Sequence, residues 1–476
     1  MFKCNRYTPV LLCIALAMTS CAVPPIVQTT GNQSVPHHYD NRDSSTNASA
    51  IRWKEFFTDQ NLISLIDTAL KNNQEVKITL QEIQMAKNDI LFRQSRLLPS
   101  VGARVGVGVD KVGRYTSQGA GDASTEIRPG EEVPDPLTDI TVAAYANWEI
   151  DIWRKLHHAK NAAITRYLSS VEGKNFLLTN MVAEVANSYY ELLALDNQLE
   201  IVRQNIGLQK NALEVVKVQK EAAAVTELAV QKFEAEVWNS QGLEFELLQR
   251  IRETENRINL LLGRYPQPIP RDKNNFLTLV PSVVNSGIPS QLLVNRPDIK
   301  QAELELAAAK LDVKVARAEF YPSLDMSAAI GLQAFKASYL AKLPESLLYA
   351  LAGDLTGPLI NRKAIKAEFN NANARQLQAM YNYERSILNA YLEVSTQLSK
   401  IDNLEKAYDA KSKEVEALTR STDISTILFA SARADYLEVL MTQRDALKSK
   451  LELVETKKEQ LIAVVNVYRD LGGGWQ

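Results

Sequence analysis

The stretch RLLPSVGARVGVGVD, residues 96–110, changes its apolar period within a few residues. Before Pro99 the chain has the spacing of a long polar helix, and a proline ends a helix and pushes the preceding residue toward extended geometry. After it, apolar residues alternate with small or charged ones, which is the period of a β-strand. The apolar positions are Val101, Ala103, Val105, Val107 and Val109. We therefore expect a helix to end near residue 99 and a strand to follow directly.

The same switch from helix to strand occurs a second time in the chain. Residues 72–108 align without a gap on residues 295–331, with Pro99 on Pro322. Such self-similarity predicts an internal two-fold sequence repeat. Each strand is followed by a turn-rich loop and then by a second alternating segment. The sequence thus predicts four strands, at about residues 100–110, 139–149, 323–333 and 346–356.

Long helices are expected to fill most of the remaining chain. No proline lies between Pro136 and Pro266, and none follows Pro358, so nothing interrupts a helix there. Coiled-coil seams confirm the helical period: Val185, Tyr189, Leu192, Leu199, Val202 and Ile206 recur as Ile387, Tyr391, Val394, Ile401, Leu404 and Tyr408. The pattern relaxes at residues 220–228 and 429–437, where each half can turn back. This predicts two antiparallel hairpins with helices of roughly 60 and 35 residues, about 90 Å for the longer one.

The amino terminus has the features of an export signal. A positive n-region precedes the short apolar run of residues 10–17, which is too short for a spanning helix. Met18-Thr19-Ser20-Cys21 then resembles the lipobox of bacterial lipoproteins, with Met at a position where Leu is usual. We expect residues 1–20 to be a lipoprotein signal peptide, Cys21 to be lipidated, and residues 21–50 to be a polar tether. By the same resemblance, Ala22 rather than Asp after this cysteine favours passage to the outer membrane.

Composition excludes several function classes. The chain has 476 residues and a formal net charge of -2, so no nucleic-acid partner is indicated. Its three cysteines, Cys4, Cys13 and Cys21, all lie in the first 21 residues, which leaves none for a cysteine metal site in the body of the protein. The histidines form two adjacent pairs that cannot share a metal from one helix face: His37, His38, His157 and His158. We therefore expect neither an enzyme nor a cofactor, apart from the covalent lipid on Cys21.

The four strands require more than one chain. A strand of about ten residues crosses a bilayer when tilted, but four strands cannot close, and an open sheet edge in lipid is costly. Two chains would give an eight-stranded barrel filled by side chains, and three would give a twelve-stranded barrel wide enough for a pore. The small polar residues on one strand face favour three. We expect a first repeat at residues 51–262, a connector at 263–294 and a second repeat at 295–476.

Several blocks of the sequence resemble the TolC family of outer-membrane factors, specifically the lipoprotein branch that serves resistance-nodulation-division efflux pumps. Residues 287–331 carry the most recognisable block, with Arg296-Pro297-Asp298-Ile299 and Phe320-Tyr321-Pro322. Residues 148–153, 436–444 and 468–475 also match. Arg154 departs from the family pattern, in which a glycine is common. The resemblance covers nearly the whole mature chain.

The resemblance implies a mixed α and β membrane protein: a homotrimeric channel-tunnel with a twelve-stranded β-barrel in the outer membrane and a long α-helical barrel in the periplasm. It implies a periplasmic adaptor and an inner-membrane, proton-driven pump as partners, and outer-membrane lipid as surroundings. The function expected is a passive exit duct for drugs or other small toxic compounds. Two alternatives stay open: an exit duct for type I polypeptide secretion, and a periplasmic coiled-coil adaptor or scaffold.

Candidate channel residues follow from the strand pattern and from the family match. On the polar strand faces, Arg104, Asp110 and Asp325 are expected in the barrel lumen or at its mouth. The closed inner end of such a tunnel requires a constriction where charges form rings. The family match places Ala432 at the tip glycine, Glu438 at one aperture carboxylate, and Met441 where a second carboxylate is usual. Asp435, one helical turn from Glu438, is a further candidate for that ring.

Overall fold

The computed structural model describes residues 24–26, 35–39, 48, 51–273, 276–279, 286–357, 362–431 and 433–475. The expectations for Cys21 and Ala432 therefore lie outside the described residues. The chain divides into two compact units. The sheet unit consists of Met1–Thr30, Gln84–Leu168 and Leu304–Tyr381, and the hairpin unit consists of Gly31–Ile83, Ser169–Glu303 and Asn382–Gln476.

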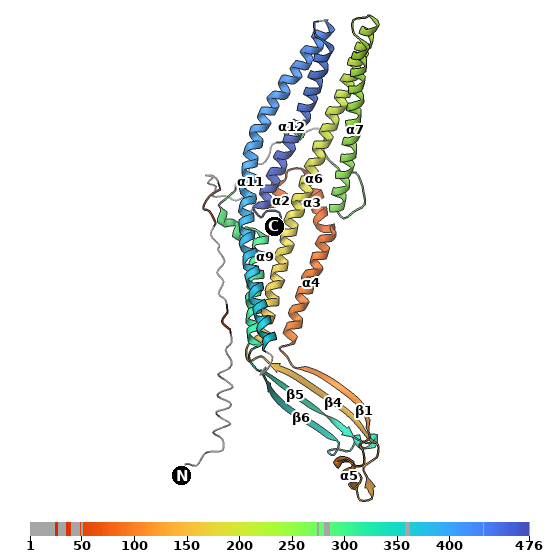
Figure 1. Ribbon diagram of the computed structural model, residues 1–476, viewed down its shortest axis with the longest axis vertical. Helices are drawn as coiled ribbons and strands as arrows, with labels where there is room; N and C mark the ends of the chain where they lie inside the picture. Colours follow the sequence, from red (N-terminus) through yellow and green to blue (C-terminus); the bar gives the residue numbers. More distant parts are fainter. Residues whose placement is uncertain are drawn as a thin grey trace. The chain divides into compact units, whose positions relative to one another are not determined.

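The sheet unit contains a four-stranded antiparallel sheet with the order β1-β4-β5-β6 (Figure 1). Its strands are β1 (Ser100–Asp110), β4 (Leu137–Ile150), β5 (Ser323–Ala334) and β6 (Leu347–Thr356). Each begins and ends within two residues of the range expected from the alternation of the sequence. The segment between β1 and β4 adds three short elements: α5 (Ser117–Asp122), β2 (Glu126–Arg128) and β3 (Glu131–Glu132). Helix α10 (Ala337–Leu340) lies between β5 and β6.

The two helices that lead into the sheet have the same length. Helix α4 (Gln74–Ser95) and helix α9 (Pro297–Ala318) each have 22 residues. The side chain of Asn73 accepts a hydrogen bond from the Glu75 amide at 2.7 Å and thereby caps α4. Proline at the first position of α9 fits a helix start, because its missing N–H has no partner there anyway. Pro99 and Pro322 follow the two helices and separate them from β1 and β5.

Two long helical hairpins account for nearly half of the chain. The first hairpin is formed by α6 (Lys155–Glu221, 67 residues) and α7 (Glu227–Leu261, 35 residues). The second is formed by α11 (Lys363–Ala430, 68 residues) and α12 (Tyr436–Asp470, 35 residues). The expected turns within residues 220–228 and 429–437 are confirmed (Figure 1). Among the described residues, no helix combines the length and the apolarity that crossing a membrane demands.

The hairpin unit has an apolar core around the base of both hairpins. Short elements surround it: α2 (Trp53–Phe56), α3 (Gln60–Asn72), η2 (Phe276–Thr278), η3 (Pro289–Gln291) and α8 (Leu292–Asn295). Helix α3 turns its apolar stripe inward, with Leu62 and Ile66 fully buried. The ring of Phe56 stacks on Tyr468 of α12 with centroids 4.1 Å apart. The core therefore joins segments from the beginning, the middle and the end of the chain.

Candidate functional site

One face of the four-stranded sheet is apolar along its whole width. The register places Val105 opposite Val142, Val142 opposite Leu332, and Ile330 opposite Tyr349. Side chains of paired residues on neighbouring strands emerge on the same side of the sheet. The apolar residues of the four strands therefore form one continuous surface. Its outer strands carry side chains that are 67% to 78% exposed: Val101, Val105, Val107, Val109, Tyr349, Leu351 and Leu355. These side chains are not buried by any described residue of the chain. An apolar face of this size requires an apolar environment.

Aromatic side chains mark the end of the sheet where the strands meet the helices. The Trp148 indole donates a hydrogen bond to the carbonyl of Leu97 at 3.1 Å, and the Trp153 indole donates to the carbonyl of Pro322 at 2.7 Å. Trp153 also stacks on Tyr321, with centroids 4.7 Å apart. Half-exposed Trp and Tyr at the rim of an apolar band are typical of the aromatic belts of membrane proteins.

The opposite face of the sheet is small and polar. Arg104 lies along this face, and its Nε is close to the space above Gly106, which has no side chain. Asp110 ends β1 and is exposed. The ring of Tyr145 occupies the space above Gly102, where a larger side chain would collide with it. The predicted residues Arg104 and Asp110 thus share one face, at different heights of the same strand.

Asp325 lies in a row of carboxylates that the sequence pattern did not predict. The register sets Glu149 and Asp354 directly beside it on the neighbouring strands. Ser323 donates a hydrogen bond to Asp325 at 2.8 Å, and Lys155 pairs with Glu149 at 2.5 Å. The three acids come from positions far apart in the chain, so only the strand register brings them together.

The candidate aperture residues lie in the first turn of α12. Asp435 is its N-cap, and its side chain accepts a hydrogen bond from the Leu437 amide at 3.4 Å. Glu438 is exposed and forms no ion pair with any described residue, while Met441 is 47% exposed. At the tip of the first hairpin, by contrast, Lys220 and Glu227 form an ion pair. The structure therefore places both predicted carboxylates at the tip of the second hairpin. Asp435 also stabilises the start of α12 as its N-cap.

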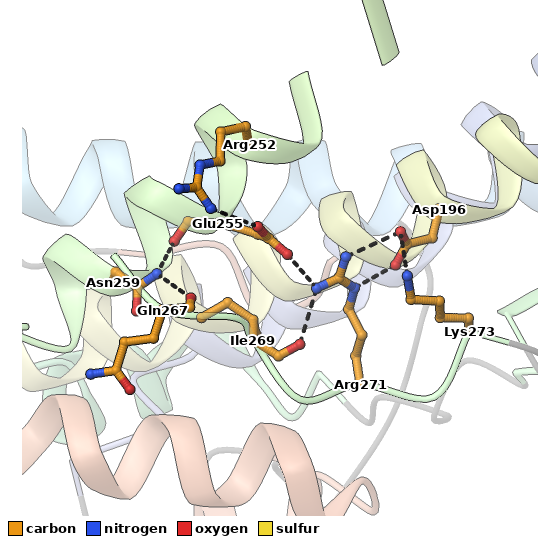
Figure 2. A network of polar contacts seen from close by, with 8 residues as sticks. All are labelled: Asp196, Arg252, Glu255, Asn259, Gln267, Ile269, Arg271 and Lys273. Atoms are coloured by element: carbon orange, nitrogen blue, oxygen red, sulfur yellow. Dashed lines mark hydrogen bonds and ion pairs between the residues drawn. The ribbon is translucent and has the colours of Figure 1, made fainter. Parts of the chain in front are cut away.

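Arg271 is the centre of a buried polar network in the hairpin unit (Figure 2). Its guanidinium, 6% exposed, binds both oxygens of Asp196 on α6 and donates to Glu255 on α7 at 2.7 Å. It also donates to the carbonyl of Ile269 at 3.0 Å. Burial opposes its charge, yet the two carboxylates raise the pKa of Arg271. The connector is thus fixed to both helices of the first hairpin.

Arg296, from the RPD block, makes a comparable set of contacts with the second hairpin. It donates to Asp298 at 2.6 and 3.0 Å, to Glu393 of α11 at 2.8 Å, and to the carbonyl of Asp470 at the end of α12 at 2.9 Å. Burial opposes the charge, but the carboxylates of Asp298 and Glu393 raise the pKa of Arg296. Burial also raises the pKa of the Asp470 carboxyl. Sequence reasoning singled out the block but not these partners.

His157 lies beside a carboxylate that caps a helix. Asp151, between β4 and α6, accepts hydrogen bonds from the amides of Leu156 and His157 and caps α6. The His157 Nδ1 lies 2.5 Å from the same carboxylate. Burial works against the charge of Asp151, but the hydrogen bonds of His157 outweigh it and lower the pKa of this carboxyl. In the described ranges, no group of three His, Cys, Asp or Glu side chains is arranged to hold a metal ion.

Comparison with known proteins fits this geometry. The family model described as outer membrane efflux protein matches residues 65–264 and 288–473. The chain belongs to the outer membrane efflux protein family. The family expected from the sequence blocks is thereby confirmed, and with it an outer-membrane location, a role in efflux, and a protein that is not an enzyme.

The alignments with curated relatives cover nearly the whole length of this efflux protein. The pyoverdine export outer membrane protein OpmQ of Pseudomonas aeruginosa is 30% identical over 433 residues, covering 90% of this chain and 89% of that protein. The cation efflux system protein CusC of Escherichia coli is 25% identical and covers 98% of both chains. A solvent efflux pump outer membrane protein, SrpC of Pseudomonas putida, is 24% identical over 95% of this chain and 93% of that protein.

Solved structures share the fold. A membrane protein from Pseudomonas aeruginosa superposes with a TM-score of 0.85 and 23% identity, over 94% of this chain and 97% of that chain. The MtrE outer membrane channel of Neisseria gonorrhoeae, in its open state, gives a TM-score of 0.82 and 21% identity, over 95% and 98%. The mixed architecture of long helices with a small sheet is therefore that of known outer membrane channels.

Proposed function

We propose that three copies of this efflux protein form one continuous exit duct, with a twelve-stranded barrel in the outer membrane and a helical barrel in the periplasm. The observation that carries the proposal is the sheet: one face is apolar across all four strands, while β1 and β6 are its two edges. In lipid, unpaired strand edges cost several kcal/mol for each polar group. Pairing β6 of one copy with β1 of the next removes every edge.

The polar face of the sheet would line the lumen of this barrel. Small residues such as Gly106 and Gly108 leave room in the interior, whereas a barrel of eight strands would be filled by its side chains. Arg104 and Asp110 would face the lumen or the outer mouth. Asp325, with Glu149 and Asp354, would lie at the inner end of the barrel. An internal two-fold repeat would explain why one chain supplies two strand pairs of the same kind.

The duct would be passive and would work with a periplasmic adaptor and an inner-membrane pump. The relatives are named for export of pyoverdine, cations and solvents. We assign this protein to the efflux of small toxic compounds, with the choice of compound made upstream of the duct.

A lipid on Cys21 would add a second attachment to the membrane. Ile26, five residues after this cysteine, packs against an apolar cluster that contains Phe320 and Phe369. Phe320 stands just before Pro322 and β5, at the end of the sheet with the aromatic belt. Five residues span at most roughly 17 Å, so the lipid would remain close to the inner leaflet. Cys21→Ser is expected to abolish acylation, as measured by metabolic labelling with a fatty acid, and to leave the fold intact.

The tip of the second hairpin would be the periplasmic aperture. Glu438, exposed and unpaired among the described residues, would contribute one carboxylate from each of three copies, with Asp435 beside it. Like charges brought together in such a ring attract cations and repel one another. This would make the tip responsive to salt and to cationic solutes.

Deletion of the protein, followed by measurements of drug susceptibility and of secreted polypeptides, tests the proposed role. Raised susceptibility with an unchanged set of secreted proteins is expected. Loss of a secreted polypeptide with unchanged susceptibility would favour type I secretion instead. Purified protein should also migrate as heat-modifiable trimers and conduct ions in planar bilayers. A protein without conductance would point to the adaptor or scaffold alternative.

A further inference from the structure

Three cations surround one tyrosine ring in the loops at the far end of the sheet. The Arg128 guanidinium carbon lies 5.4 Å from the centroid of the Tyr339 ring, the Lys336 ammonium 5.6 Å, and the Lys342 ammonium 4.6 Å. Arg128 belongs to β2, and the other residues belong to the segment between β5 and β6. Two segments more than 200 residues apart in sequence thus build this group, which we call the Tyr339 cluster.

The Tyr339 cluster is held in place by hydrogen bonds. Glu131 of β3 accepts one from the Tyr339 hydroxyl and one from the Lys336 ammonium, both at 2.8 Å. Ser346, which is 5% exposed, donates to the carbonyls of Leu340 and Lys342 at 2.8 Å. These bonds fix the loop that carries the two lysines. The cations are therefore set around the ring before any ligand arrives, which lowers the entropic cost of binding.

Positive charge exceeds negative charge in this cluster. Glu131 is the one carboxylate among its members, and its bonds to Lys336 and Tyr339 lower the pKa of that carboxyl. Two neighbouring acids have other partners: Glu126 accepts from the Gly130 amide at 3.0 Å, and Asp135 lies 3.8 Å from Lys111. Arg128 and Lys342 form no ion pair with any described residue. Two exposed cations are thus left to attract an anion.

The cluster directly follows the end of β5, a strand that contributes to the apolar face of the sheet. Ala334, the last residue of β5, lies opposite Ile140 on that face, and Lys336 follows it two residues later. Leu343, next to Lys342, is 64% exposed. In the proposed orientation the helices lie in the periplasm, so this end of the sheet reaches the outer surface of the outer membrane. A row of apolar side chains that ends in fixed cations matches a lipid with an anionic head.

We propose that the Tyr339 cluster is a binding site for the phosphorylated glycolipid of the outer leaflet. Arg128 and Lys342 would bind a phosphate group of its head, while Leu343 and the apolar face of the sheet would contact its acyl chains. Arginine and lysine make strong, charge-assisted hydrogen bonds to phosphate oxygens. The inference rests on the proposed orientation in the membrane, but not on what the duct exports.

Binding of lipid A to the purified full-length protein tests the inference. Protein in mild detergent is titrated with lipid A that carries both phosphates and with lipid A from which both have been removed, and bound lipid is counted by native mass spectrometry. The double variant Arg128→Gln, Lys342→Gln should bind the phosphorylated form about a hundredfold more weakly, because it removes two charged contacts to phosphate and each loss lowers affinity by on the order of tenfold. The single variant Lys342→Gln should lose affinity in the same direction.

A matched control comes from the same loops. The single variant Arg114→Gln removes one positive charge outside the cluster, as Lys342→Gln does within it, and should bind within twofold of the unchanged protein. Equal binding by the cluster variant and this control would overturn the inference, as would equal binding of dephosphorylated lipid A. Displacement of the lipid by millimolar inorganic phosphate would show a site for free anions instead. Conductance in planar bilayers should be unchanged in all variants, so a failed duct and a failed lipid site give different results.

Discussion

Arg271 in the connector and Arg296 just after it each bind one hairpin, but they do so in different surroundings. Both side chains are 6% exposed. The acceptors of Arg271 are buried as well, since the side chains of Asp196 and Glu255 are 3% and 14% exposed. The carboxylates bound by Arg296 are more accessible, with Asp298 20% and Glu393 44% exposed. The first hairpin is therefore held by a closed ionic network and the second by a half-open one.

The two hairpins differ at the position of Asp196. At the offset of 202 residues that relates the two coiled-coil seams, Asp196 corresponds to Leu398, which is buried. The first hairpin is followed by an irregular connector, and Asp196 binds Arg271 of that connector. A buried ion pair adds little net stability because desolvation offsets its attraction. A buried ion pair does favour one arrangement of the chain segments that it joins. We interpret the Arg271 network as the set of contacts that positions the connector on the first hairpin.

The largest effect is expected for Arg271→Gln. The change leaves Asp196 buried without its main partner, and breaking a buried pair on one side typically costs about 3–5 kcal/mol. Lys273, 3.3 Å from Asp196, limits the loss toward the lower end of that range. Chemical denaturation of the full-length protein at fixed concentration measures the change in free energy of unfolding.

Lys273→Gln is the matched control for this prediction. Its side chain is 60% exposed, so the same loss of one positive charge should cost less than about 1 kcal/mol. Equal destabilisation by both variants would mean that charge alone, and not burial, matters at Asp196.

Arg296→Gln is expected to destabilise the protein less, by about 1.5–3 kcal/mol, because water can replace its contact with Glu393. The same denaturation series measures this value. The change also removes the hydrogen bond to the Asp470 carbonyl, so hydrogen exchange should increase at the end of α12. An effect as large as that of Arg271→Gln would remove the distinction between a closed and a half-open network.

The sequence predicted those parts of the fold that depend on neighbours in the chain. Alternation after Pro99 and Pro322 located the strands, and the relaxed pattern at residues 220–228 and 429–437 located both turns. It also placed Glu438 and Asp435 in one helical turn. Local signals suffice there because period, proline and capping act over a few residues.

The arginine networks and the Tyr339 cluster were beyond such reasoning. Arg271 meets Asp196 across 75 residues, and Arg296 meets Glu393 across 97. Tyr339 meets Glu131 across 208 residues. No sequence period links positions so far apart. Each partner alone looks like an ordinary charged or polar residue of an exposed helix or loop. Only the register and the packing of the elements bring the charges together.

A smaller effect is expected for Lys400→Gln, which breaks a half-exposed bridge between α11 and α12. Lys400 binds Glu459 at 2.7 Å, with side chains 37% and 32% exposed, so the loss should be under about 1 kcal/mol. Burial works to raise the pKa of Glu459, but the bond to Lys400 outweighs it and lowers that pKa. The contribution of the bridge is therefore present above the unfolded pKa, about 4.3, and is lost as pH falls through the folded value.

Unfolding measured at neutral pH and again near pH 3 distinguishes this cause from a loss of packing. The unchanged protein and Lys400→Gln should differ at neutral pH and converge in acid, because protonated Glu459 no longer attracts the lysine. A difference that stays constant with pH would assign the effect to the apolar stem of the lysine.

At the tip of the second hairpin, Glu438→Ala is expected to leave stability within about 0.5 kcal/mol, since exposed positions without partners contribute little. Its effect should instead appear in conduction. If three Glu438 carboxylates line the aperture, removing them lowers the local negative potential, so single-channel recordings should show altered conductance and a weaker preference for cations. Glu227→Ala, at the tip of the first hairpin, is the control: it breaks an ion pair with Lys220 and should leave cation preference unchanged. Equal conduction by both variants and the unchanged protein would remove Glu438 from the aperture and leave Asp435 as the remaining carboxylate in that turn.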